Sequence, residues 1–234
     1  MRRLGVDIGS LTLNAALLDG EQVIDRWSFE HEGRVDSAVR SVLGNPRWAG
    51  FDRVGVTASQ AAAGATAGTG VIDATLATIE GARFLLPGCR NVLAMGGQSF
   101  SLILLDEHGR YVEHAGNPPC ASGTGSFLEQ QAERLGVDAP GLARRAGAFT
   151  GRVPRIASRC AVFAKTDITH AMQEGHSLDA VAAGLCEGIA RSMLDLLVKG
   201  RRLSAPVGLV GGVARNARIA SAIREMLGAE VVVP

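Results

Sequence analysis

The sequence is poor in aromatic residues, carries no excess of charge of either sign and contains no long apolar run. It has seven Phe, two Trp and one Tyr among 234 residues, and its formal net charge is +1. A nucleic-acid-binding surface needs clustered Lys and Arg, usually with stacking aromatics, so this class is excluded. No apolar run approaches the roughly 20 residues that a membrane-spanning helix requires. We therefore expect no nucleic-acid partner and no membrane segment.

Cysteine is also scarce, and no secretion signal is recognisable. The apolar run after Met1 is interrupted by Asp7, which is not the pattern of a signal peptide. Four cysteines in such a chain indicate the cytoplasm, where thiols stay reduced and paired cysteines more often serve metal or redox chemistry. With 47% apolar residues, the chain can bury a core and has room for one or two domains.

Two segments place a cysteine at the expected start of a helix. Cys120 opens a glycine-rich turn ahead of a helix predicted at about 123–135, and Cys160 opens a helix predicted at about 160–173. The start of a helix is electropositive because its first N–H groups are unpaired and its peptide dipoles add. This field favours a thiolate, which binds iron or zinc. The glycine turn also suits a phosphate, so metal and nucleotide are both candidates.

A strand, a glycine-rich polar bend and an apolar strand occur twice. The first copy spans residues 4–19 with its bend at 9–12, and the second spans 91–106 with its bend at 96–99. Each bend offers backbone N–H groups and hydroxyls to a phosphate, and Asp7 can hold a Mg²⁺-bound water. Two such bends facing one another across a cleft can hold a nucleoside triphosphate. The alternative interpretation is two ordinary hairpins.

The remaining pattern alternates strands and helices. A Gly-Gly turn at 211–216 between a strand and a helix lets the backbone approach a flat ligand such as adenine, although such a loop is common. Strands are expected at 22–29, 53–57, 111–115, 206–210 and 230–233, and helices at 35–43, 72–84, 178–197 and 216–227.

Five motifs occur in order along the chain: DIGS at 7–10, MGGQ at 95–98, CASGTGSFLE at 120–129, SRCAVFA at 158–164 and GGVARN at 211–216. Together they resemble the activator ATPases of 2-hydroxyacyl-CoA dehydratases and the related ATPase subunits of benzoyl-CoA reductase. The sequence at 130–136 and 164–167 resembles the large multidomain activators more closely than the small stand-alone ones. The resemblance implies an α/β, two-lobed actin/sugar-kinase-like (ribonuclease H-like) ATPase fold, with lobes at 1–88 and 89–234.

The resemblance also implies a function. A [4Fe–4S] cluster would be shared across a homodimer, with Cys120 and Cys160 from each subunit, and ATP hydrolysis with Mg²⁺ would drive an electron to an acyl-CoA dehydratase or reductase. A ferredoxin or flavodoxin would act upstream. Asp7 and Gln98 would be catalytic. Nucleotide-binding residues would be Gly9, Ser10, Thr12, Gly96, Gly97, Gln98, Gly123, Thr124, Gly125, Glu129, Gly211, Gly212 and Asn216.

Several positions depart from the family pattern. Asn14 stands where the family usually carries Lys, and Ala94 and Ser99 stand where it carries acidic residues. Those carboxylates would organise Mg²⁺ or orient water, so hydrolysis should suffer more than binding. The family also adds a short segment after the position of Pro234, so we expect either a piece of a longer protein or a divergent end.

Two alternatives to an active electron donor therefore remain. One is a degenerate nucleotide-binding domain that hydrolyses little or no ATP and partners a competent copy. The other is a small-molecule kinase, with Asp106 or Asp167 as the available bases, although paired cysteines have no purpose there. Cys89 and Cys186 are interpreted as core residues, and the alternative for Cys120 and Cys160 is likewise two small buried hydrophobes.

Overall fold

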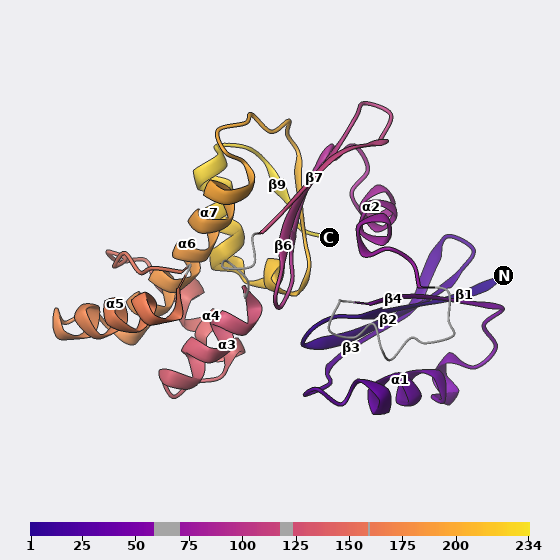
Figure 1. Ribbon diagram of the computed structural model, residues 1–234, viewed down its shortest axis with the longest axis horizontal. Coiled ribbons are helices and arrows are strands. Elements are labelled where there is room, and N and C mark those ends of the chain that lie inside the picture. Colours follow the sequence, from indigo (N-terminus) through magenta and orange to yellow (C-terminus); the bar gives the residue numbers. More distant parts are fainter. Residues whose placement is uncertain (59–70, 118–123, 159) are drawn as a thin grey trace. The chain divides into compact units, whose positions relative to one another are not determined.

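The chain forms two compact units in a computed structural model that describes residues 1–58, 71–117, 124–158 and 160–234. The first unit is Met1–Glu80 and the second is Gly81–Pro234. Each unit contains one mixed β-sheet with helices packed on it (Figure 1). The division falls within a helix, α2 (Ala74–Leu85). The predicted lobes 1–88 and 89–234 stay a prediction.

The first unit is a four-stranded sheet in the order β3-β2-β1-β4. Alternate residues of β1, namely Leu4, Val6 and Ile8, are buried, and the same period continues in β2. The helix α1 and Trp48 share the core cluster on this face. The opposite face carries polar side chains near the first bend, such as Asp7 and Asn14, and small or apolar residues such as Gly5, Ala16 and Leu18 further along. The elements are β1 (Arg2–Ile8), β2 (Thr12–Asp19), β3 (Gln22–Glu30), α1 (Val35–Leu43), the 3₁₀ helix η1 (Pro46–Trp48) and β4 (Arg53–Ala58).

The second unit is a five-stranded sheet in the order β7-β6-β5-β8-β9, with most of its core formed against α6. Twelve residues of α6 are buried, which is why its sequence is apolar around much of its circumference. The elements are β5 (Asn91–Met95), β6 (Phe100–Leu105), β7 (Tyr111–Gly116), α3 (Gly125–Arg134), α4 (Ala139–Ala148), α5 (Ala161–Gln173), α6 (Leu178–Leu197), β8 (Val207–Val210), η4 (Gly212–Arg215), α7 (Ala217–Leu227) and β9 (Val231–Val232).

The two sheets repeat one topology. In each, the first strand pairs antiparallel with the strand that follows it and parallel with the fourth strand of the unit. The repeat of strand, bend and strand predicted at 4–19 and 91–106 is therefore confirmed. It places each bend at the carboxyl end of a central strand, where the parallel neighbour also ends.

Most predicted elements are present with small shifts of their ends. The helix α4 was missed because Pro140, Gly141 and Gly147 weaken its pattern. It forms nonetheless, with its proline in the first turn and the Asp138 carboxylate accepting from the N–H of Gly141 at 2.7 Å. None of the helices in the described part of the chain is long and apolar enough to span a membrane.

Candidate functional site

The first bend is closed by its own backbone. The N–H of Gly9 donates to the carbonyl of Thr12 at 2.9 Å, just beyond Ile8 and Leu13, the last pair of β1 and β2 residues. A Cβ on Gly9 would lie 2.9 Å from that same carbonyl oxygen, so only glycine fits here. Ser10 and Thr12 are half-buried in the bend. The bend therefore has the compact form expected of a phosphate-binding turn.

A buried histidine braces this bend. His31 is 5% exposed, and its Nδ1 accepts from the N–H of Gly33 at 3.1 Å. Its Nε2, which then carries the proton, lies 3.1 Å from the carbonyl of Gly9 and donates to it. The backbone N–H of His31 also donates to the carbonyl of Leu11 at 3.1 Å. Two carbonyls of the first bend are thus fixed by one residue at the end of β3.

Asp7 stands at the carboxyl end of β1, beside the bend. Its Oδ2 accepts from the Asn14 amide at 3.1 Å, and the Asn14 Oδ1 accepts from the Ser28 hydroxyl at 2.7 Å. The pKa of Asp7 is raised because the surrounding protein removes water from the carboxylate, and the Asn14 hydrogen bond offsets part of this effect. No Lys or Arg side chain contacts Asp7 in the described residues, so its charge is unpaired.

The second bend has the same closure. The N–H of Gly96 donates to the carbonyl of Ser99 at 2.8 Å, and a Cβ on Gly96 would lie 3.2 Å from that oxygen. Gln98 and Ser99 are exposed in the bend. The last strand pair before the bend is Met95–Phe100 in the second unit and Ile8–Leu13 in the first. Ala94 precedes Met95 as Asp7 precedes Ile8, so Ala94 occupies the position that Asp7 holds in the first unit. Only the first bend therefore has a carboxylate at this place.

The start of α3 is attached to the second bend. The Thr124 hydroxyl donates to the carbonyl of Gly96 at 2.9 Å, and the N–H of Gly125 donates to the same carbonyl at 3.3 Å. The N–H of Ser126 donates to the carbonyl of Gly97 at 2.9 Å. These helix-start groups hold the second bend in shape. Glu129 is half-buried one turn further on. Gly123 and Cys120 lie outside the described residues.

The Gly-Gly turn lies against the end of β5. Gly211 has a φ of 97°, and a Cβ there would lie 2.3 Å from the carbonyl oxygen of Met95, so glycine is required. Gly212 is exposed, with open space around it. The Asn216 Oδ1 caps α7 by accepting from the N–H groups of Arg218 and Ile219, and its Nδ2 lies 3.4 Å from the Cys186 sulfur. Both polar atoms of the Asn216 side chain are thus engaged within the protein.

Cys160 is the N-cap residue of α5 and is only half-buried. The backbone N–H of Phe163, and next that of Val162, lower the pKa of its thiol. A thiol with a lowered pKa ionises more readily than an ordinary one. By contrast, burial raises the pKa of Cys186 to about 12. Burial also raises the pKa of Cys89. The interpretation of these two as core residues is confirmed by their burial.

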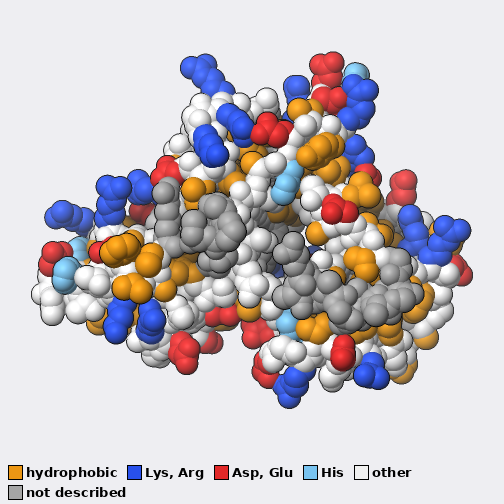
Figure 2. All heavy atoms as spheres, viewed as in Figure 1, with side chains coloured by type: hydrophobic (Ala, Val, Ile, Leu, Met, Phe, Trp, Pro, Cys, Tyr) orange, Lys and Arg blue, Asp and Glu red, His pale blue; other side chains and the backbone are white. Residues whose placement is uncertain are grey.

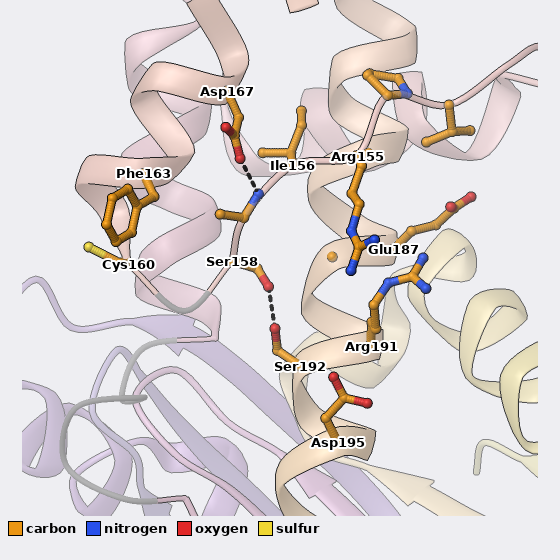
Figure 3. Close-up of a pocket in the computed structure, with 15 residues that line it drawn as sticks. Arg155, Ile156, Ser158, Cys160, Phe163, Asp167, Glu187, Arg191, Ser192 and Asp195 are labelled. Carbon is orange, nitrogen blue, oxygen red and sulfur yellow. Dashed lines mark hydrogen bonds between the residues drawn. The ribbon is translucent and has the colours of Figure 1, made fainter.

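A groove of about 840 Å³ borders Cys160 (Figure 3). The segment 153–158 forms one wall, and the start of α5 and the middle of α6 form the others. The Ser158 and Ser192 hydroxyls lie 2.6 Å apart across the groove. The guanidinium groups of Arg155 and Arg191 come from the segment and from α6 and point toward the same space. Glu187 beside them is paired with Arg218.

The groove is flanked by exposed apolar side chains on α5. Val162 is 70% exposed and Phe163 is 67% exposed, although both adjoin Cys160. Hydrophobic side chains gather over the α5 end of the second unit (Figure 2). These two side chains make a small apolar surface beside the thiol.

The two carboxylates considered for a kinase are engaged elsewhere. Asp106 accepts from the backbone N–H groups of His108 and Arg110 and from the Arg110 guanidinium. These contacts, led by the Arg110 N–H, lower its pKa, which makes it a weak general base. The Asp167 Oδ2 accepts from the N–H of Ala157 at 2.8 Å. Within the described residues, no group of three or more His, Cys, Asp or Glu side chains forms a metal site.

The α/β architecture with a repeated strand order and two closed bends is that of the actin-like ATPases, as predicted. One solved structure is titled "Activator of the 2-Hydroxyisocaproyl-CoA Dehydratase from Clostridium difficile with bound ADPNP". Its similarity to this protein covers 100% of this chain and 88% of the chain in that structure. The TM-score is 0.85 at 28% identity. The fold class is therefore confirmed.

The chain belongs to the BadF/BadG/BcrA/BcrD ATPase family, whose family model matches residues 4–233. A 2-hydroxyisocaproyl-CoA dehydratase activator of Clostridioides difficile is 32% identical over 66% of this chain and 58% of that protein. The activator of lactoyl-CoA dehydratase of Anaerotignum propionicum is 28% identical over 100% of this chain and 91% of that protein. The predicted family is confirmed.

Proposed function

We propose that this protein is an ATP-dependent electron-transfer activator of an acyl-CoA dehydratase or reductase. In this proposal, Cys160 and Cys120 are ligands of a [4Fe–4S] cluster shared by two copies of the chain. The observation that carries it is the Cys160 thiol, which is partly exposed at the start of α5 and has a lowered pKa. The names of the relatives as dehydratase activators support the choice of partner.

The chemistry of Cys160 fits an iron–sulfur cluster. Such clusters are held by four cysteine thiolates, and the N–H groups at the start of α5 favour that charge state. Cys186 and Cys89 are buried, with raised thiol pKa values, and do not compete as ligands. Two ligands from each of two chains complete the set of four, which is why the proposal includes a homodimer. When bound, the cluster would supply one-electron chemistry.

The two bends fit the phosphates of ATP with Mg²⁺. Both present backbone at a glycine, which admits no side chain at Gly9 and leaves little room for one at Gly96, and Asp7 offers a carboxylate beside the first bend. ADPNP, an ATP analogue, is bound in the relative's structure. Gly211 and Gly212 would lie along the base, whereas Asn216 would serve mainly as the cap of α7. Gln98, exposed in the second bend, is the residue proposed to orient water.

The test is the iron and acid-labile sulfide content of protein purified without oxygen. We expect about two iron atoms per chain, because a four-iron cluster is shared by two copies. Cys160→Ala should lose this iron, whereas Cys89→Ala, which removes a buried thiol of raised pKa, should retain it. Wild-type protein without iron, or iron retained in Cys160→Ala, would contradict the proposal.

A second function is favoured by one observation at the second bend. Ala94 takes the place that corresponds to Asp7, and Ser99 closes the bend without a carboxylate. A domain that binds nucleotide, hydrolyses little of it and partners a competent copy would have this composition. The rate of ATP hydrolysis by the iron-loaded protein separates the two functions. ATP hydrolysis that is abolished by Asp7→Asn supports the ATP-dependent activator. Nucleotide binding without hydrolysis supports the degenerate domain.

A further inference from the structure

The first bend contains a backbone N–H group that the protein itself does not use. The N–H of Ser10 has no hydrogen-bond partner among the described residues, although Gly9 before it closes the bend. The peptide bond between these two residues is trans. In a trans peptide the N–H points in the direction opposite to the preceding carbonyl. The direction of the Ser10 N–H is therefore set by the direction of the Gly9 carbonyl.

Gly9 does little by itself to fix that direction. The bend requires glycine at this position, because a Cβ would lie 2.9 Å from the carbonyl oxygen of Thr12. Glycine is also the residue with the greatest backbone freedom, so its own preferences constrain the following peptide only weakly. A rotated peptide would bring the carbonyl oxygen, which carries partial negative charge, toward a bound phosphate. The bend therefore needs a donor from outside to hold this carbonyl.

His31 supplies that donor from the residue after β3. Its Nε2 donates to the Gly9 carbonyl at 3.1 Å, and its backbone N–H donates to the Leu11 carbonyl at 3.1 Å. The side chain is 5% exposed, so water has little access to compete for the Gly9 carbonyl. One buried residue thus holds two carbonyls on the same side of the bend.

A tight turn fixes the orientation of the imidazole. Glu32 and Gly33 have left-handed φ values of 48° and 78°, and the N–H of Gly33 donates to His31 Nδ1 at 3.1 Å. The N–H of Arg34 donates to the His31 carbonyl at 2.7 Å and closes the turn. A backbone N–H can only donate, so Nδ1 is the acceptor and the ring proton is on Nε2, facing Gly9. The turn therefore selects the tautomer that the bend needs.

The second bend holds the corresponding carbonyl with different groups. Gly96 follows the last strand pair of its unit as Gly9 does in the first. Its carbonyl accepts from the Thr124 hydroxyl at 2.9 Å and from the N–H of Gly125 at 3.3 Å. An imidazole in one unit and a helix start in the other thus bind the same carbonyl. This recurrence favours a requirement of the bend itself over an accident of one loop.

We propose that His31 is a positioning residue for nucleotide binding. By holding the Gly9 carbonyl, its Nε2–H turns the Ser10 N–H to the side of the bend away from the imidazole, where a phosphate oxygen accepts from it. The inference rests on the proposed nucleotide binding, and it adds a residue that contacts neither the nucleotide nor a metal. An N–H that is aimed before the anion arrives costs no ordering on binding, which is how His31 raises the affinity.

Two substitutions separate the two hydrogen bonds of the imidazole. Counted in bonds from Cα, Gln places a nitrogen donor where Nε2 lies, and Asn places an oxygen acceptor where Nδ1 lies. Each variant loses one of the two bonds, so both should lose similar stability in urea unfolding. Calorimetry with ADPNP and Mg²⁺ on the full chain should separate them. We expect about tenfold weaker binding in His31→Asn and an affinity within about twofold of wild type in His31→Gln.

The control variant is His114→Asn, at an exposed position on β7, which should leave the affinity for ADPNP unchanged. The tautomer is tested in the wild-type protein and so does not depend on the folding of a variant. NMR spectra that correlate ring protons with ring nitrogens in isotope-labelled protein should show the His31 proton on Nε2.

Two results would overturn the positioning role alone. One is a ring proton on Nδ1. The other is equal affinity of His31→Asn and His31→Gln for ADPNP while the wild-type protein binds it, since a purely structural role would affect both variants alike. Wild-type protein that binds no ADPNP would overturn the proposed nucleotide binding as well.

Discussion

At the scale of single residues, surroundings decide what a cysteine does. Cys160 begins α5, where N–H groups stabilise its thiolate, whereas Cys186 is 0% exposed in α6 and its thiol pKa is about 12. The two side chains are chemically identical. The difference arises because a helix start exposes unpaired N–H groups, whereas a helix interior packed against a core offers a thiolate little compensation.

This difference predicts the pH dependence of alkylation in metal-free protein. A lowered pKa means that the Cys160 thiolate persists to a lower pH than that of an ordinary thiol, so iodoacetamide should label it first as the pH is raised from 6 to 9. Cys186 should stay unlabelled over this range. Mass spectrometry of peptides measures both. In urea-unfolded protein the two should react alike, and similar rates in folded protein would contradict the assignment.

At the scale of elements, two glycines of α6 determine where the segment before Cys160 lies. A Cβ on Gly184 would lie 2.5 Å from the carbonyl oxygen of Pro154, and a Cβ on Gly188 would lie 2.6 Å from that of Ile156. The backbone of this segment therefore lies directly on the helix. The Ser158–Ser192 hydrogen bond and the contact from Asp167 to Ala157 hold its far end. The place of Cys160 thus depends on residues of α6 that are distant in sequence.

Gly188→Ala should accordingly destabilise the second unit. The added methyl group collides with backbone, which cannot move as a side chain can, so we expect a loss of about 1–3 kcal/mol in the free energy of unfolding. Gly147→Ala in α4, where a Cβ meets open space, is the control and should be neutral or stabilising by up to about 1 kcal/mol. Urea unfolding measures both. Equal stability of the two variants would show that the segment moves freely.

At the scale of the whole molecule, one topology is used twice with different chemistry. Both sheets place a closed bend beside their central strand, yet only the first has a carboxylate there, Asp7, where the second has Ala94. The second unit instead carries the cysteine motifs and the groove beside Cys160. The two copies thus share the form of the bend and differ in the side chains around it.

The proposed shared cluster predicts that metal content controls the oligomeric state. Each chain would contribute two thiolates, so iron-loaded protein should be a dimer, and removal of the iron by a chelator should shift it toward monomers. Light scattering after size-exclusion chromatography measures this. Cys160→Ala should behave like the chelated protein and Cys89→Ala like the loaded one. A dimer that survives complete loss of iron would contradict control by metal.

Local sequence was sufficient to predict most of the elements, α4 excepted, and part of the candidate site. The bend beside Asp7 and the helix start at Cys160 follow from residues within a few positions of one another, so their patterns predict them. His31 and Ser28 were not foreseen, because each acts on a partner in another strand or bend. The only hint in the sequence was polar residues at alternate positions of strands, which is also the pattern of an ordinary solvent-facing side.

The sequence by itself determined the α/β order of elements, the two glycine bends and a cysteine at the start of a helix. These depend on hydrophobic period, glycine and capping, which act over a few residues. The tertiary structure alone decided that the Asn216 amide contacts Cys186, and that Asn14 turns its amide toward Asp7. Each of these side chains has several possible partners within the sequence. Only strand register and helix packing bring one of them within hydrogen-bond distance, and that selection is a property of the fold.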